Sequence, residues 1–132
     1  MNRVVFSRKT DEWATPKEFF ENLDREFKFT LDPCPLGAEF DGLEIPWIGR
    51  VFVNPPYSKI KPFVARGAKA IEDGEADVVV YLVPSRTDTA WFHEFAYGRA
   101  ELRFIRGRLK FGGAKYSAPF PSMLMIFRRE AA

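Results

Sequence analysis

The chain has 132 residues, of which 46% are hydrophobic and 16% aromatic, and these proportions predict one globular domain and exclude a disordered chain. Its single cysteine, Cys34, excludes an internal disulfide and a cysteine-based metal cluster. The formal net charge is only +2, but between residues 98 and 129 eight lysines and arginines stand against one acidic residue, Glu101.

The first predicted helix covers residues 16–26. Thr15 is a favourable N-cap, and Pro16 is a favourable first helical residue. Four apolar side chains then recur at helical spacing: Phe19, Phe20, Leu23 and Phe27. Trp13 lies just ahead of this helix, where it can belong to the core or line a ligand site. Residues 1–10 are expected to form a flexible arm.

Residues 29–31 predict a short strand that ends at Asp32-Pro33-Cys34-Pro35. An acidic residue at a strand end can cap a turn, and it can also line a cofactor crevice. We expect Cys34, between two prolines, to be a packing residue rather than a nucleophile. The segment that follows, residues 37–47, lacks periodic patterning and predicts a loop.

Residues 51–53 predict a buried strand, which Asn54, Pro55, Pro56 and Tyr57 follow directly. Each proline lacks an N–H and fixes φ, so the strand stops there and the turn should be rigid, with both proline carbonyls lacking local partners. Ligands of open α/β sheets bind at the carboxyl ends of strands. A planar ring with an exocyclic amine would stack on Tyr57 and donate to the Asn54 oxygen and the Pro55 carbonyl. A plain turn that caps the strand is the alternative.

The rest of the chain continues the alternation of helices and strands. Apolar spacing predicts helices over residues 60–72 and 89–95. Apolar runs predict strands over residues 77–83, 100–105, 109–111 and 121–127. This order predicts an α/β fold with a mostly parallel sheet, covering helices and a C-terminal antiparallel hairpin.

Taken in order, these motifs resemble the phage-type DNA N6-adenine methyltransferase (Dam-like) family. Asn54 to Tyr57 matches the Asn-Pro-Pro-Tyr type of signature found in amino-group methyltransferases that use S-adenosylmethionine. The resemblance covers about Asp11 to Phe127. It includes Trp13-x-Thr15-Pro16, Asp32, Asp41-Gly42-Leu43-x-x-x-Trp47, Pro84-Ser85-Arg86-x-Asp88-Thr89-x-Trp91-Phe92, Gly107-Arg108-Leu109-Lys110-Phe111 and Pro119-Phe120-Pro121-Ser122.

The resemblance implies a single methyltransferase domain over residues 1–132, with a Rossmann-like class I fold. Asn54, Pro55, Pro56 and Tyr57 would hold the target base. The implied cofactor-binding residues are Trp13, Thr15, Pro16, Asp32, Pro33, Cys34 and Asp41. The usual glycine-rich turn is absent after Asp32, and only 21 residues separate Asp32 from Asn54, so we expect a trimmed sheet with a strand or helix missing.

The basic C-terminal segment favours a polyanionic partner, although a solvated surface has the same composition. The expected nucleic-acid contacts are Ser85 and Arg86 beside the substrate, and Arg106, Arg108, Lys110 and Lys115 on phosphates. His93, the one histidine, is expected to be structural rather than catalytic.

The resemblance implies methyl transfer from S-adenosylmethionine to N6 of adenine in DNA, by direct displacement on a flipped-out base and without a metal ion. No signal peptide or long apolar run is present, so a cytoplasmic protein is expected, and the resemblance implies one that a phage or prophage encodes in a bacterial host. Two alternatives stay open. The same motif methylates amino groups in RNA or a protein glutamine, and the chain can also be an inactive nucleic-acid-binding module on the same scaffold.

Overall fold

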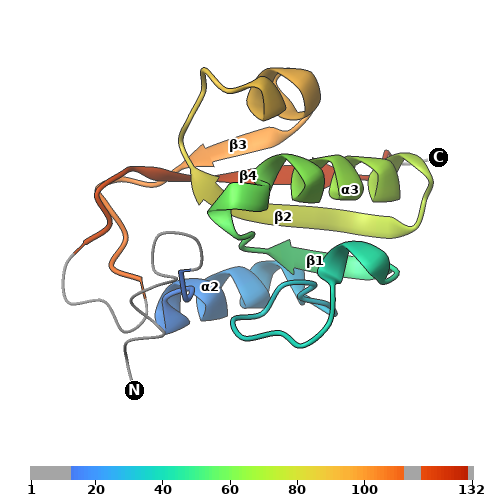
Figure 1. The fold of residues 1–132 in the computed structure, drawn as a ribbon, viewed down its shortest axis with the longest axis horizontal. Coiled ribbons are helices and arrows are strands. Elements are labelled where there is room, and N and C mark those ends of the chain that lie inside the picture. The colour runs from blue at the N-terminus through green and yellow to red at the C-terminus, as the bar shows by residue number, and fades with distance from the viewer. Residues whose placement is uncertain (1–12, 112–116, 131–132) are drawn as a thin grey trace.

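The computed structural model describes residues 13–111 and 117–130, in which a four-stranded sheet lies between helical layers (Figure 1). Its α-helices are α2 (Lys17–Phe27) and α3 (Ile60–Glu72). Its strands are β1 (Gly49–Val53), β2 (Ala76–Pro84), β3 (Glu101–Phe104) and β4 (Ser122–Arg128). Shorter helical turns are η1 (Gly42–Glu44), η2 (Tyr57–Lys59) and η3 (Phe92–Ala96). Within this part of the chain no helix is long and apolar enough to cross a membrane.

The sheet has the order β1-β2-β4-β3 and is mixed. Strands β1 and β2 pair in parallel, whereas β4 pairs antiparallel with both β2 and β3. The sheet is therefore mixed rather than clearly mostly parallel, because β4 inserts between β2 and β3. The C-terminal antiparallel hairpin is confirmed as the β3–β4 pair. Since β4 is antiparallel to both of its neighbours, β3 runs in the same direction as β1 and β2.

Two predicted strands are reduced or missing. Residues 29–31 make a single parallel bridge between Leu31 and Val51. Residues 109–111 form no strand; instead Phe111 is buried against the α2 face of the sheet, and the Leu109 carbonyl accepts from Ala118 N at 2.8 Å. The helix expected over residues 89–95 is mainly the π-turn η3, which ends where Tyr97 N donates to the Phe92 carbonyl at 2.8 Å.

Helix α2 lies one residue later than its predicted range. Pro16 occupies the N-cap with extended backbone (ψ 133°), and no side chain caps the helix. The prediction that Thr15 is the N-cap is therefore wrong, and the Thr15 hydroxyl has a different partner, described below. The helix ends at Phe27, and the C-cap Lys28 has left-handed backbone (φ 55°) and donates its N–H to the Asp24 carbonyl.

Helix α3 has the bounds predicted from its apolar spacing, and Gly67 in its middle has a packing reason. A Cβ atom at this position would lie 1.8 Å from the hydroxyl of Tyr81 on β2. That hydroxyl is buried and donates to the Phe63 carbonyl at 2.7 Å. The glycine therefore lets the helix approach the sheet closely enough for this hydrogen bond to form.

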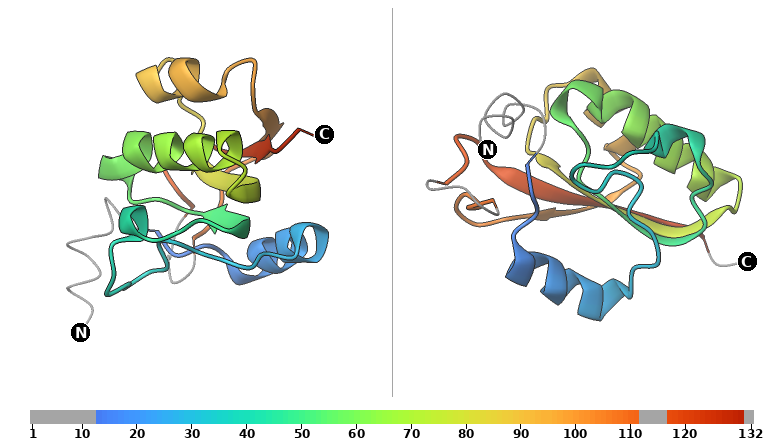
Figure 2. Two further views of the ribbon diagram at one scale, coloured as in Figure 1. Left: turned by 90° about the vertical axis from the view of Figure 1, so that its right-hand side faces the viewer. Right: turned by 60° about the horizontal axis from the view of Figure 1, so that its bottom comes forward.

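Alternating strand residues divide the core into two clusters, one on each face of the sheet. Helices α3 and α2 cover these opposite faces (Figure 2). On β1, Val51 and Val53 face α3 and η3, whereas Phe52 faces α2. The period of two follows from strand geometry. Because both faces are covered, β2 and β4 read as continuous apolar runs rather than as alternating ones.

The ends of several strands meet at one edge of the sheet. Leu31, β1 and β2 run in parallel, so Asp32, Asn54 and Ser85 all follow at the same edge. The pairing of Phe104 with Met123 places the residues after β3 at this edge too. Neighbouring strands lie about 4.8 Å apart, so β3 is roughly 14 Å from β1. The fold therefore gathers most of the predicted site residues along one line.

Candidate active site

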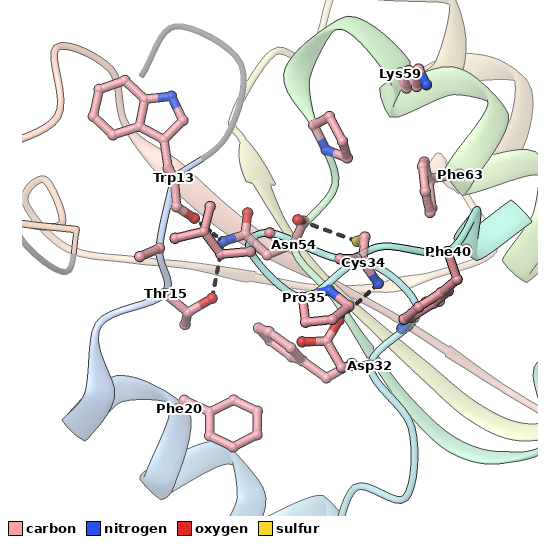
Figure 3. Close-up of a pocket in the computed structure, with 18 of the residues that line it drawn as sticks. Trp13, Thr15, Phe20, Asp32, Cys34, Pro35, Phe40, Asn54, Lys59 and Phe63 are labelled. Atoms are coloured by element: carbon pink, nitrogen blue, oxygen red, sulfur yellow. Dashed lines mark hydrogen bonds between the residues drawn. The ribbon is translucent and has the colours of Figure 1, made fainter. Parts of the chain in front are cut away.

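A cleft of about 1030 Å³ opens at this edge, between the turn after β1, the segment after Leu31 and the residues that precede α2 (Figure 3). It brings together most of the residues predicted to bind cofactor or base: Trp13, Thr15, Asp32, Pro33, Cys34, Asp41, Asn54 and Pro56. Three other predicted residues, Pro16, Pro55 and Tyr57, do not line it. An open cleft therefore separates Asn54 from Asp32.

The side chain of Asn54 is held by the segment before α2. Its amide nitrogen donates to the Trp13 carbonyl at 2.6 Å and to the Thr15 hydroxyl oxygen at 2.9 Å (Figure 3). A carbonyl oxygen only accepts hydrogen bonds, so the nitrogen of the amide must be the atom that faces Trp13. Both amide N–H groups are thereby used.

The oxygen of the same amide is buried and has no hydrogen-bond partner among the described residues. An unpaired buried acceptor costs about 1–3 kcal/mol and calls for an explanation. Here the explanation is chemical, because the amide presents one vacant acceptor and no vacant donor. In this arrangement the amide can accept a further hydrogen bond but cannot donate one.

The backbone of the turn differs in one respect from the sequence prediction. The Pro56 carbonyl accepts from Lys59 N at 2.9 Å, so it is not without a local partner. The bond closes the turn η2, which leads directly into α3. The expectation that both proline carbonyls lack local partners is therefore wrong for Pro56.

Tyr57 lies in a cluster of aromatic rings. Trp13 stacks on it at 6.2 Å between ring centroids, and Phe120 meets it edge-on at 5.4 Å. Trp13 also contacts Phe111 at 5.3 Å. Burial raises the pKa of the Tyr57 hydroxyl, an effect that the nearby positive charge of Arg86 partly opposes. The ring of Tyr57 is therefore neutral at physiological pH and shares its surroundings with Trp13.

Asp32 is half-buried on the opposite side of the cleft from Trp13 (Figure 3). Its carboxylate accepts from Cys34 N at 3.0 Å, which fixes the turn after Leu31. Burial raises the pKa of this carboxyl, and the Cys34 N–H partly offsets that rise. The Cys34 thiol donates to the Asn54 carbonyl at 3.4 Å, so Cys34 joins the two predicted halves of the site.

The charges that line the cleft are mainly negative. Four acidic residues, Glu21, Asp32, Glu39 and Asp41, face two lysines, Lys17 and Lys59. This balance suits a cationic ligand and does not suit a phosphate group. Within the described residues no group of three histidine, cysteine or acidic side chains is placed to hold a metal ion.

Comparisons with known proteins identify the family of this chain. A family model described as DNA N-6-adenine-methyltransferase (Dam) matches residues 4–131. The chain belongs to this family. Two phage proteins named DNA N-6-adenine-methyltransferase are similar to it. The one from Escherichia phage T1 is 30% identical over 112 residues, which cover 75% of this chain and 46% of that protein. The one from Haemophilus phage HP1 (strain HP1c1) is 29% identical over 147 residues, which cover 95% of this chain and 84% of that protein. The chain thus spans less than half the length of the first relative.

The predicted nucleic-acid contacts of this Dam-family chain fall into three groups. Arg86, Arg106, Arg108 and Lys110 are exposed, and Ser85 is half-buried at the end of β2. Among the described residues Arg106, Arg108 and Lys110 make no ion pair. Lys115 lies outside the described residues.

Arg103, in contrast, is engaged on the protein surface. Its guanidinium makes two hydrogen bonds of 2.7 Å to Glu26 and a third of 2.7 Å to Glu101. Glu101 also pairs with Arg128 at 2.7 Å. Arg103 and Arg128 therefore add to the basic charge of the segment without being free for phosphate.

Sequence reasoning missed several residues of the Dam-family cleft. Leu36 and Phe40 line it from the segment after Asp32, and their side chains are 58% and 47% exposed, respectively, which is high for apolar residues. Two exposed apolar residues in a loop indicate a binding site only when the loop is known to border a cavity. The contact of Thr15 with Asn54 was also missed, because the two residues are 39 positions apart in the sequence.

Proposed function

We propose that this chain is an S-adenosylmethionine-dependent DNA methyltransferase that modifies N6 of adenine, on a trimmed Rossmann-like class I fold. Membership of the Dam family supports the substrate and the reaction. The observation that carries the proposal is the buried side-chain oxygen of Asn54, which follows the end of β1. This oxygen accepts no hydrogen bond from any of the described residues.

The trimmed fold is supported by the way the strands meet. Leu31, β1 and β2 are parallel neighbours, and their carboxyl ends form the cleft. Between Asp32 and β1 the structure has only the short turn η1 as regular structure. This is the region in which the sequence predicts a missing strand or helix.

The residues present fit the cofactor. When bound, S-adenosylmethionine supplies an activated methyl group on a sulfonium, which is a cation without phosphate. The excess of acidic residues in the cleft matches that charge, and the carboxylate of Asp32 is the most buried candidate to face it. Trp13, Pro33, Cys34 and Asp41 complete the proposed cofactor residues, with Pro16 behind them at the start of α2. Thr15, which the sequence predicts with them, lines the same cleft and is bonded to Asn54.

The residues of the turn would hold the target amine. Asn54 accepts one N–H of the exocyclic amine through its side-chain oxygen, and the Pro55 carbonyl accepts the other. These bonds favour a tetrahedral nitrogen, whose lone pair is then directed at the methyl group. Positioning of this kind is worth up to about 7–11 kcal/mol. The proton leaves after transfer, when the nitrogen is cationic, so no general base has to act first.

Base flipping is part of the proposal, because an adenine inside a duplex cannot reach Asn54. Extrusion costs a few kcal/mol, and stacking on the aromatic cluster of Tyr57 returns about 1–3 kcal/mol of it. The exposed Arg86, Arg106, Arg108 and Lys110 are proposed to bind the backbone, beside Ser85.

The test is methyl transfer measured side by side on three substrates. The purified chain is incubated with methyl-labelled S-adenosylmethionine and duplex DNA, RNA or a glutamine-containing protein, and the modified base is then mapped. Label on N6 of adenine in DNA is the expected result, with Asn54→Ala as the inactive control. Label confined to RNA or protein would refute the substrate assignment. Cofactor binding without transfer to any of the three would show an inactive binding module.

A further inference from the structure

We propose that Thr15 is a positioning residue for methyl transfer, and that it acts by locking the Asn54 amide with its oxygen toward the substrate amine. This inference rests on the proposed function of Asn54 and adds a role outside the Asn54–Tyr57 turn. It differs from the cofactor contact that the sequence predicts for Thr15. Its basis is the hydrogen bond of 2.9 Å between the Thr15 hydroxyl oxygen and the Asn54 amide nitrogen.

An asparagine amide needs two constraints to present its oxygen reliably. The terminal torsion of asparagine is broad and roughly two-fold, so one hydrogen bond leaves the amide plane free to rock. The Trp13 carbonyl, at 2.6 Å, supplies the first constraint and excludes the flipped amide, because two carbonyl oxygens would then face each other. Thr15 supplies the second by accepting the other N–H.

The alternative roles of Thr15 are weaker in this structure. It is not the N-cap of α2, because Pro16 holds that position and no side chain caps the helix. Thr15 does line the cleft, so a direct cofactor contact is the competing role. The two roles differ in what they change: a cofactor contact sets the affinity for S-adenosylmethionine, whereas an amide lock sets the rate of transfer.

The unpaired oxygen of Asn54 is the group whose direction the hydrogen bond from Asn54 to Thr15 fixes. With both N–H groups bonded, the amide cannot donate to a ligand and can only accept. If Thr15 is replaced by valine, which has the same shape without the hydroxyl, one N–H loses its partner. The amide then rotates about the remaining bond to Trp13, and its oxygen no longer points in one direction.

The experiment compares Thr15→Val with the matched control Thr15→Ser, which keeps the hydroxyl. We expect Thr15→Val to lower kcat about tenfold, as the loss of one neutral hydrogen bond implies, and Thr15→Ser to stay within about twofold of wild type. The dissociation constant of S-adenosylhomocysteine, measured by titration, should not change. In the Asn54→Ala background, Thr15→Val should have no further effect. A weaker cofactor affinity with an unchanged kcat would overturn the proposal.

A second readout does not need catalysis. The side-chain NH₂ signals of Asn54, assigned by their loss in Asn54→Ala, should be separate and slow to exchange in wild type and Thr15→Ser. In Thr15→Val they should move and exchange faster, while the backbone spectrum shows a folded protein. Unchanged signals would overturn the amide lock. If the signals respond but wild type methylates no DNA, the proposed function fails and the Thr15–Asn54 contact stands. If wild type is active and Thr15→Val keeps its kcat, the positioning role fails alone.

Discussion

Replacing Asn54 by alanine should separate activity from stability in this chain. The substitution removes two hydrogen bonds, to the Trp13 carbonyl and the Thr15 hydroxyl. It also removes a buried oxygen that has no partner among the described residues. Losing the hydrogen bonds lowers the stability of the fold, whereas removing the unpaired buried oxygen raises it, so the two effects oppose each other.

The magnitudes follow from this arrangement. Two neutral hydrogen bonds contribute about 1–3 kcal/mol in total, and one unpaired buried acceptor costs about 1–3 kcal/mol. We therefore expect the free energy of unfolding to change by no more than about 1–2 kcal/mol. Activity should fall at least about a hundredfold, or roughly 2.7 kcal/mol of transition-state stabilisation, because the acceptor for the amine is gone.

The assay pairs the initial rate of adenine methylation in duplex DNA with urea unfolding of the same samples. Asn22→Ala is the matched control, since Asn22 is exposed on α2 and its side chain bonds only to that of Arg25 within the described residues. The control should leave both quantities near wild type. A loss of stability beyond about 3 kcal/mol, or activity within about fivefold of wild type, would refute the reasoning.

Three further predictions test other parts of the site. Tyr57→Phe should keep most of the methylation rate and Tyr57→Ala should lose at least about tenfold, because only the second removes the stacking face; equal losses would contradict stacking. Asp32→Asn should weaken S-adenosylmethionine binding without lowering the melting temperature. Burial raises the pKa of Asp32 above its ordinary 3.8, so the folded state holds this proton more tightly and the contribution of Asp32 to stability falls as pH rises from 3.8 through the raised pKa. The difference in stability between wild type and Asp32→Asn should show this fall. Arg108→Ala should make the salt dependence of DNA affinity shallower by about 0.9 in log–log slope, and Lys69→Ala, an exposed charge on α3, should not.

Much of the site could be predicted from sequence because its residues follow strands. Val51 to Val53 form a buried strand, and the prolines after it end the strand where the pattern predicts. Asp32 likewise follows the parallel bridge at Leu31. Residues at strand ends are placed by the sheet, so local pattern is enough to bring Asp32 and Asn54 to one cleft.

What the sequence could not provide is the pairing between distant segments. No periodic pattern shows that the Trp13 carbonyl and the Thr15 hydroxyl bind Asn54, and a threonine before a proline favours the helix-cap interpretation instead. The position of β4 was missed for the same reason, because an apolar run such as Met123 to Phe127 does not show that its strand lies between β2 and β3. Nor does a count of basic residues show that Arg103 is committed to Glu26.

The insertion of β4 between β2 and β3 has a consequence for the order of folding. Val79 pairs with Phe127, 48 positions later, and β3 joins the sheet only through β4. During synthesis on the ribosome, the segment up to β3 therefore emerges with an open seam where the central partner belongs. Native contacts across that seam can form only once β4 is available, so a released chain that ends at residue 121 should remain sensitive to protease, whereas the chain that includes β4 should be resistant.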